Sequence, residues 1–152
     1  MIGWIAIAIT VAIFAAIAIR IDDWGRDWSE NFAELDVDAE RSELRPLTLQ
    51  GPIESLVKRL DDWTTQRGQW ELVSSTIYER PLEDGTLATS KLTRRTAVFR
   101  FVDDIEVRFV QEGDGSQITL YASSQARVGK GDLGQNPRNL IELKGCFDEQ
   151  AN

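Results

Sequence analysis

The chain has 152 residues, a formal net charge of −8 at pH 7 and an apolar fraction of 42%. A surface this acidic repels phosphate backbones, which makes nucleic acid a poor partner. The sequence contains no histidine, so the commonest general base and the commonest metal ligand are both missing. The single cysteine, Cys146, cannot form an internal disulfide or a CxxC metal site. We expect Cys146 to be a small apolar residue packed near the chain end, and we expect no metal and no cofactor.

The segment from Ile2 to Ile19 carries no charged residue, and Thr10 is its one polar side chain. Eighteen helical residues span about 27 Å, close to the ~30 Å thickness of a bilayer's hydrocarbon core. The sequence therefore predicts a transmembrane anchor over residues 1–20, in contact with the lipid bilayer through Ile2 to Ile19. The alternative is a cleaved signal peptide, because Ala16-Ile17-Ala18 fits a small-x-small cleavage pattern. The lack of a basic residue before the apolar run, together with the length of that run, favours a retained anchor.

Residues 21–51 are rich in aspartate and glutamate and carry apolar residues at irregular spacing. We interpret them as an acidic juxtamembrane connector, by default a solvated tether and alternatively a stretch that lies along a partner. Trp24, Trp28 and Phe32 are the expected partner contacts in this segment. A compact domain is expected over residues 52–152.

The domain is expected to open with a helix. Pro52 suits a first helical turn, and Arg67-Gly68 marks the end of the pattern. Between them, apolar residues recur at spacings of three and four and form one stripe. The stripe consists of Ile53, Leu56, Val57, Leu60 and Trp63.

Strands are expected next, over Trp70 to Arg80 and from Thr86 to Phe101. Between Ala97 and Phe109 every odd-numbered residue except Asp103 is apolar, which indicates one buried face. A three-residue loop from Val102 to Asp104 would keep Phe101 opposite Ile105 and so preserve that face. On this interpretation, Asp103 and Asp104 are turn residues rather than a catalytic pair of carboxylates.

A four-residue loop from Glu112 to Gly115 would pair Gln111 with Ser116 and place Phe109 opposite Ile118, with Leu120 and Ala122 continuing inward. A last helix is expected to begin near Asn136, because asparagine is a strong N-cap and Pro137 follows it. Its apolar surface comes from Leu140, Ile141, Leu143 and Phe147. The predicted fold class is α+β, with an N-terminal transmembrane helix, then a helix, a four-stranded antiparallel sheet and a helix, with both helices on one sheet face. The other face is expected to be polar and to meet solvent or a partner through Arg100, Glu106, Arg108, Gln117 and Thr119.

The segment from Ser123 to Asn139 is the best candidate site, because glycines, cations and amides gather between a strand and a helix start. Glycines before a helix N-terminus can cradle an anion, although the spacing of a nucleotide P-loop is missing. The structural reading is that the polar side chains hydrogen-bond a long loop into one shape, and we weight it above the functional one. The candidate binding or loop-organising residues are Arg127, Gly129, Lys130, Asp132, Gly134 and Asn136.

Two runs, Phe99 to Arg108 and Ser124 to Asn136, together resemble the family of domains of unknown function numbered 1499 (DUF1499). The resemblance covers Pro52 to Phe147, and five of the candidate site residues, Lys130 excepted, fall on the family's fixed positions. The chain departs from the pattern at Gly131, where the family has serine, and at Asn139, where it has arginine. Family members are often exported as bacterial lipoproteins or face a thylakoid lumen. The resemblance therefore implies the periplasmic side of a bacterial inner membrane, whereas Arg20 and Arg26, counted alone, would place the domain in the cytoplasm.

These observations favour a non-catalytic accessory or assembly subunit of an integral membrane protein complex, and bioenergetic complexes are one class of host. The alternative is a tethered binding module for a small apolar or anionic ligand, with its pocket between sheet and helices and Arg127 or Lys130 at the mouth. A hydrolase is the least favoured reading, because no residues form a catalytic arrangement.

Overall fold

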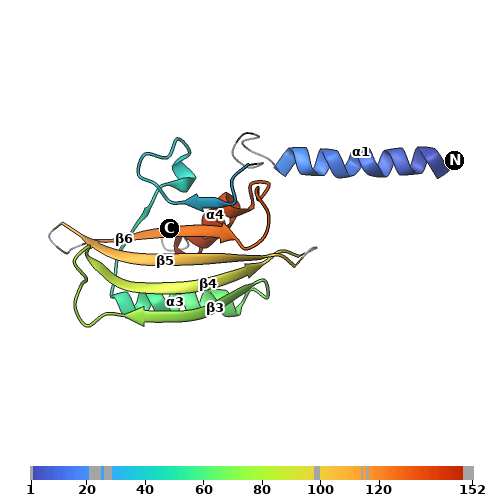
Figure 1. Cartoon of the computed structure of the whole chain (residues 1–152). Helices are drawn as coiled ribbons and strands as arrows, with labels where there is room; N and C mark the ends of the chain where they lie inside the picture. Colours follow the sequence, from blue (N-terminus) through green and yellow to red (C-terminus); the bar gives the residue numbers. More distant parts are fainter. Residues whose placement is uncertain are drawn as a thin grey trace.

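The structure is a computed structural model that describes residues 2–20, 25, 29–97, 100–113, 115 and 117–148. An antiparallel sheet with two helices on one face forms the body of the protein, and a further helix extends from its N-terminal side (Figure 1). The elements in chain order are α1 (Ile2–Arg20), β1 (Phe32–Glu34), the 3-10 turn η1 (Ser42–Leu44), β2 (Leu47–Leu49), α3 (Ile53–Thr65), β3 (Trp70–Ile77), β4 (Thr86–Arg95), β5 (Val102–Glu112), β6 (Gln117–Ala126) and α4 (Gln135–Asp148).

The sheet has six strands, not the four that the sequence predicted. Five follow the order β1-β6-β5-β4-β3, and β2 also pairs with β6, farther along that strand. Phe32 of β1 pairs with Gln125, and Leu47 of β2 pairs with Leu120. Both extra strands come from the segment interpreted as a connector. Each is three residues long and finds its partner far away in the chain, so neither produces a recognisable alternation of its own.

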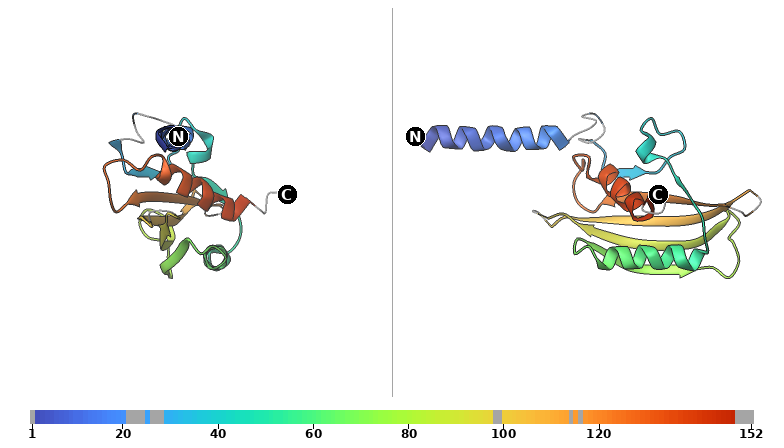
Figure 2. Two further views of the ribbon diagram at one scale, coloured as in Figure 1. Left: turned by 90° about the vertical axis from the view of Figure 1, so that its right-hand side faces the viewer. Right: turned by 180° about the vertical axis from the view of Figure 1, so that it is seen from behind.

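The prediction of a transmembrane helix was also wrong. Helix α1 exists over 19 residues, but no helix in the described part of the chain is both long and apolar enough to cross a membrane. The single-pass topology and the placement in a bacterial inner membrane are therefore both withdrawn. In two opposite views, α1 projects away from the sheet (Figures 1 and 2). Trp24 and Trp28 lie outside the described residues.

The predicted helices at both ends of the domain are present. Pro52 caps α3, whose stripe faces the sheet, and Trp63 meets Trp70 edge-on with ring centroids 4.9 Å apart. Helix α4 covers the same sheet face, where Phe147 packs against Phe109 (Figure 2). The Nε–H of Arg59 on α3 donates to the carbonyl of Cys146 at 2.7 Å and so joins the helices. The Cys146 side chain is buried in the core, as expected.

The β4–β5 connection differs from the prediction. Strand β5 begins at Val102, so Asp103 and Asp104 lie within the strand and not in a turn. Asp103 pairs with Arg94 and Ile105 with Leu92, while Phe101, which was expected opposite Ile105, is 49% exposed. The predicted odd-numbered phase is correct from Asp103 onward, and the polar Asp103 belongs to the buried face. Phe99 lies outside the described residues.

The β5–β6 hairpin has the predicted phase with a shifted register. Gln111 pairs with Ile118, so Phe109 lies opposite Leu120 rather than Ile118. Ile118, Leu120 and Ala122 are buried as expected. Thr119 was expected on the solvent face and is buried, between Val110 on one side and Thr48 of the unforeseen strand β2 on the other.

Candidate functional site

The loop after β6 is organised by Asp132. Its Oδ1 accepts the backbone N–H of Gly134 at 2.9 Å, and its Oδ2 accepts the backbone N–H of Asn136 at 2.5 Å. Leu133 and Gly134 both adopt positive φ angles, 53° and 72°, which turn the chain back toward the carboxylate. The anion at the start of α4 is therefore the protein's own Asp132, in the position that an external anion would have taken.

Asn136 is fully buried and connects three parts of the chain. The Ser124 hydroxyl donates to its Oδ1 at 2.7 Å, and its Nδ2 donates to the carbonyl of Asn31 at 2.7 Å. Asn31, just before β1, donates in turn from its Nδ2 to the carbonyl of Gly129 at 2.9 Å. The loop, β6 and the approach to β1 are thus tied together, which supports the loop-organising interpretation of Gly129 and Asn136.

Asn139 extends this network to β5. Its Nδ2 donates to Oδ2 of Asp103 at 2.9 Å and to Oγ of Ser124 at 3.0 Å, and Gln135 donates to its Oδ1 at 2.8 Å. Asn139 is fully buried, and the amide occupies the place where the resemblance led us to expect an arginine. The sequence interpretation missed Asn31, Asp103, Ser124 and Asn139. Their partners are distant in the chain, so no local pattern marks them.

Asp103 is the buried titratable group of this network and is only 2% exposed. Burial raises the pKa of its carboxyl, and the neighbouring Asp132 and Asp104 add to that effect. The hydrogen bond from Asn139 and the charge of Arg94 act in the opposite direction. A carboxyl with a raised pKa is a candidate for acid-base work, but Asp103 is fixed between strand and helix and is sealed from solvent. We assign it to the architecture of the network.

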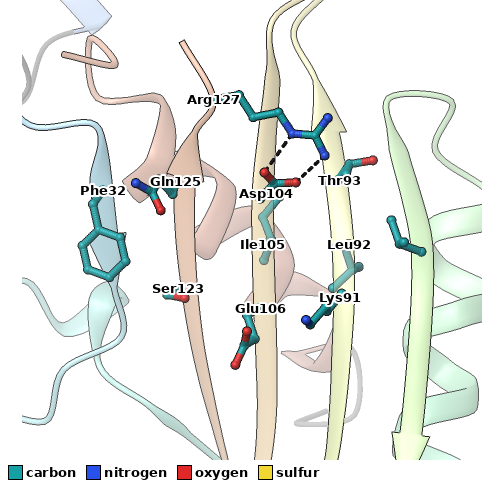
Figure 3. Close-up of a pocket in the computed structure, with 11 residues that line it drawn as sticks. Phe32, Lys91, Leu92, Thr93, Asp104, Ile105, Glu106, Ser123, Gln125 and Arg127 are labelled. Atoms are coloured by element: carbon teal, nitrogen blue, oxygen red, sulfur yellow. Dashed lines mark hydrogen bonds and ion pairs between the residues drawn. The ribbon is translucent and has the colours of Figure 1, made fainter. Parts of the chain in front are cut away.

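Arg127 and Asp104 form a forked ion pair on the other face of the sheet. Nε of Arg127 donates to Oδ2 of Asp104 at 2.8 Å and Nη2 donates to Oδ1 at 2.7 Å (Figure 3). The hydrogen bonds lower the pKa of Asp104 and raise that of Arg127. Arg127 is therefore already neutralised by a partner in the fold. Lys130 is exposed and makes no hydrogen bond or ion pair with the described residues.

The face of the sheet away from the helices carries a hollow of about 370 Å³. It lies over strands β1, β6, β5 and β4, and its polar lining includes Lys91, Glu106 and Gln125 (Figure 3). A smaller hollow of about 120 Å³ adjoins it and shares Phe32, Glu106 and Ser123. We had expected a pocket between sheet and helices, but Leu60, Phe109 and Leu140 fill that space and are fully buried.

A comparison with protein families shows which family the chain is related to. The model of a family described as "Protein of unknown function (DUF1499)" matches residues 27–145. The chain belongs to the DUF1499 family. The match begins well before Pro52, so this DUF1499 domain includes β1, β2 and the tie at Asn31. No curated protein and no solved structure matches the chain.

The open face of this DUF1499 domain has the chemistry of a recognition surface. The larger hollow is lined by the cations Lys91 and Arg127 and the anions Asp104 and Glu106, of which Arg127 and Asp104 are paired, and the aromatic Phe32 borders them. Among the described residues, no group of three or more cysteine, aspartate or glutamate side chains is placed to hold a metal ion. Charged side chains of both signs beside an exposed ring suit a polar partner held by hydrogen bonds and ion pairs.

Proposed function

We propose that this DUF1499 protein is a non-catalytic accessory subunit of a larger protein complex and that α1 holds it there. The observation that carries this proposal is the exposure of apolar side chains along α1, exemplified by Trp4 at 78%. A helix that is apolar around its whole circumference is ordinarily buried, because water contact with every face is costly. The exposed large side chains of α1 are Trp4, Ile5, Ile7, Ile9, Val11, Ile13, Phe14 and Ile19.

The magnitude of this exposure favours a stable association. Full burial of one large apolar side chain stabilises by about 1.5–3 kcal/mol. Eight of them together outweigh all but the upper estimates of the entropic cost of joining two proteins, which is about 4–15 kcal/mol. Since the apolar residues occupy every side of α1, the partner has to surround the helix rather than meet one stripe. The class of partner that we propose is an integral membrane protein complex, whose protein subunits enclose the helix.

The alternative of a small-ligand pocket between sheet and helices has less support. That space is filled by fully buried side chains, including Leu92, Ile105 and Leu143. The two hollows described above lie on the opposite face and are open to solvent. We therefore place the ligand-pocket alternative below the subunit proposal.

The proposal is tested by affinity purification of the tagged full chain from its native cells in a mild non-ionic detergent. We expect defined proteins to co-purify in constant ratio, and we expect the α1 variant Ile9→Asp to lose them. The matched control is Val37→Asp, which places the same charge on an exposed apolar residue outside α1 and should retain every partner. Recovery of the bare monomer from native extracts would overturn the proposal, as would equal partner retention by both variants.

A further inference from the structure

The strand registers align side chains in rows across the open face. Glu34 pairs with Ser123, Ser123 with Glu106, and Glu106 with Lys91, so these four residues form one row from β1 to β4. Paired residues of neighbouring strands point to the same side of a sheet, and Figure 3 shows the members that it labels on this face. The adjacent row begins with Phe32 and continues through Gln125 and Asp104.

Glu34 and Glu106 are the unpartnered carboxylates of this row. They flank Ser123 from the two neighbouring strands, which places their backbones roughly 10 Å apart, or two strand spacings. Both are exposed, and neither forms a hydrogen bond or ion pair with the described residues. Three other acids near this face are engaged: Asp104 with Arg127, Asp84 with Arg108, and Glu112 with the hydroxyl of Tyr121. A further exposed acid, Glu71, lies on the edge strand β3, at the opposite edge of the sheet from β1.

An aromatic ring stands beside the two free carboxylates. Phe32 is 42% exposed, lies two residues before Glu34 on β1, and lines both hollows of the open face. An aromatic face attracts a cation, and two carboxylates within reach add a second and stronger attraction. The three side chains together provide the chemistry that recognises a guanidinium or ammonium group.

We propose that the open face is a docking surface for an extended segment of a partner protein that carries an arginine or lysine. The cationic head lies over Ser123 between Glu34 and Glu106 and against the ring of Phe32. Charge complementarity supports this occupant, because the chain as a whole has a net charge of −8 and so steers basic partners toward it. The surface is separate from α1, so it adds to the proposed subunit role and does not depend on it.

The test uses the full chain, labelled with ¹⁵N and kept in an uncharged detergent, and titrates it with the peptide acetyl-Thr-Val-Arg-Val-Thr-amide. We expect saturable shifts of the backbone resonances of Phe32, Ser123 and Glu106. We also expect Glu34→Gln and Glu106→Gln each to weaken binding about two- to five-fold, as the loss of one solvated ion pair does. The matched control Asp61→Asn removes the same charge from an exposed position on α3, on the far side of the sheet, and should leave the affinity unchanged.

A second peptide and a second assay keep the proposal open to refutation. The same peptide with glutamine in place of arginine should bind weakly or not at all; equal binding would overturn the proposal, as would an unchanged affinity in the Glu34→Gln/Glu106→Gln double variant. The ¹⁵N spectrum of each variant reports whether it is folded.

Sedimentation of the full chain tests the other occupant, a second copy of the protein. A dimer that Lys91→Glu abolishes and Lys91→Glu/Glu106→Lys restores would assign this face to self-association and also overturn the proposal.

Discussion

Asp103 and Asp104 are neighbours in β5, yet their carboxyl groups lie on opposite faces of the sheet. Asp103 accepts a hydrogen bond from Asn139 of α4 on the covered face, and Asp104 accepts two from Arg127 on the open face. Burial raises the pKa of the first, while the Arg127 hydrogen bond lowers the pKa of the second. Strand alternation therefore separates two adjacent acids into different environments and prevents them from acting as a pair.

The raised pKa of Asp103 has a definite effect on stability. The folded protein holds the proton of Asp103 more tightly than the unfolded chain does, so the protonated carboxyl stabilises the fold. This stabilisation is fully present below the ordinary pKa of 3.8 and is lost as pH rises through the folded-state pKa. The variant Asp103→Asn keeps an oxygen acceptor for Asn139 and has no charge to bury. We expect the free energy of unfolding of this variant to increase relative to that of the wild type as pH rises from about 3.8 toward neutrality.

Urea unfolding of both proteins between pH 3.5 and 7 measures this effect, and the difference between the two curves cancels the contributions of other acids. Curves that stay parallel across the range would show that burial does not perturb Asp103.

The amide of Asn136 is expected to be a major stabilising contact. Asn136→Ala removes the hydrogen bonds to Ser124 and to the carbonyl of Asn31 in a fully buried position. A loss of about 1–3 kcal/mol in the free energy of unfolding is expected from unsatisfied buried groups. Lys130→Ala, in the same loop but exposed, should change stability by no more than about 0.5 kcal/mol. Similar small losses in the two variants would contradict the buried network.

Asp132 is expected to act as the cap of α4. Asp132→Ala should cost about 1 kcal/mol, because two backbone N–H groups lose their acceptor. Asp132→Asn retains an acceptor oxygen and should cost less, which separates the cap from a general effect of substitution. Thermal unfolding measures both, and a larger loss for asparagine than for alanine would argue against the capping role.

Helix α3 and the buried phase of β5 could be predicted from the sequence because both depend on local periodicity. Leu56, Leu60 and Trp63 repeat at helical spacing, and Ile105, Val107 and Phe109 alternate as a strand with one buried face does. These patterns arise from side chains that meet the core within a few residues of one another, so a short window contains the whole signal.

The parts that could not be predicted depend on partners far along the chain. Asp103 was interpreted as a turn residue because aspartate favours turns and a loop there would keep Phe101 opposite Ile105. Its actual partner, Asn139, lies 36 positions later. Strand β1 has too few residues to alternate, and its place in the sheet is set by pairing with β6. The membrane span was predicted from the length and apolar composition of the N-terminal segment, whereas no helix among the described residues is both long and apolar enough to cross a membrane.

Alanine substitutions at Gly85 and at Gly145 are expected to change the stability of the protein in opposite directions. Gly85 has a φ of 81°, and a Cβ there would lie 2.6 Å from the carbonyl oxygen of Gln111. Gly85→Ala should therefore destabilise the protein by more than about 1 kcal/mol. Gly145 lies within α4 with nothing near its missing Cβ, so Gly145→Ala should stabilise by about 0.5–1 kcal/mol. Chemical denaturation measures both, and effects of the same sign would contradict the backbone geometry of one site.

The tie at Asn31 determines how a mechanical load on α1 would enter the domain. Asn31 is the residue before β1, and its side-chain amide donates to the carbonyl of Gly129. Its backbone carbonyl accepts hydrogen bonds from the side-chain amide of Asn136 and from the backbone N–H of Ala126. A force applied to the N-terminal helix is therefore resisted by β6 and α4 together, and not by the pairing of the three-residue strand β1 alone. If α1 is attached to a partner that moves, we expect the sheet of the domain to stay intact under the force that this partner applies.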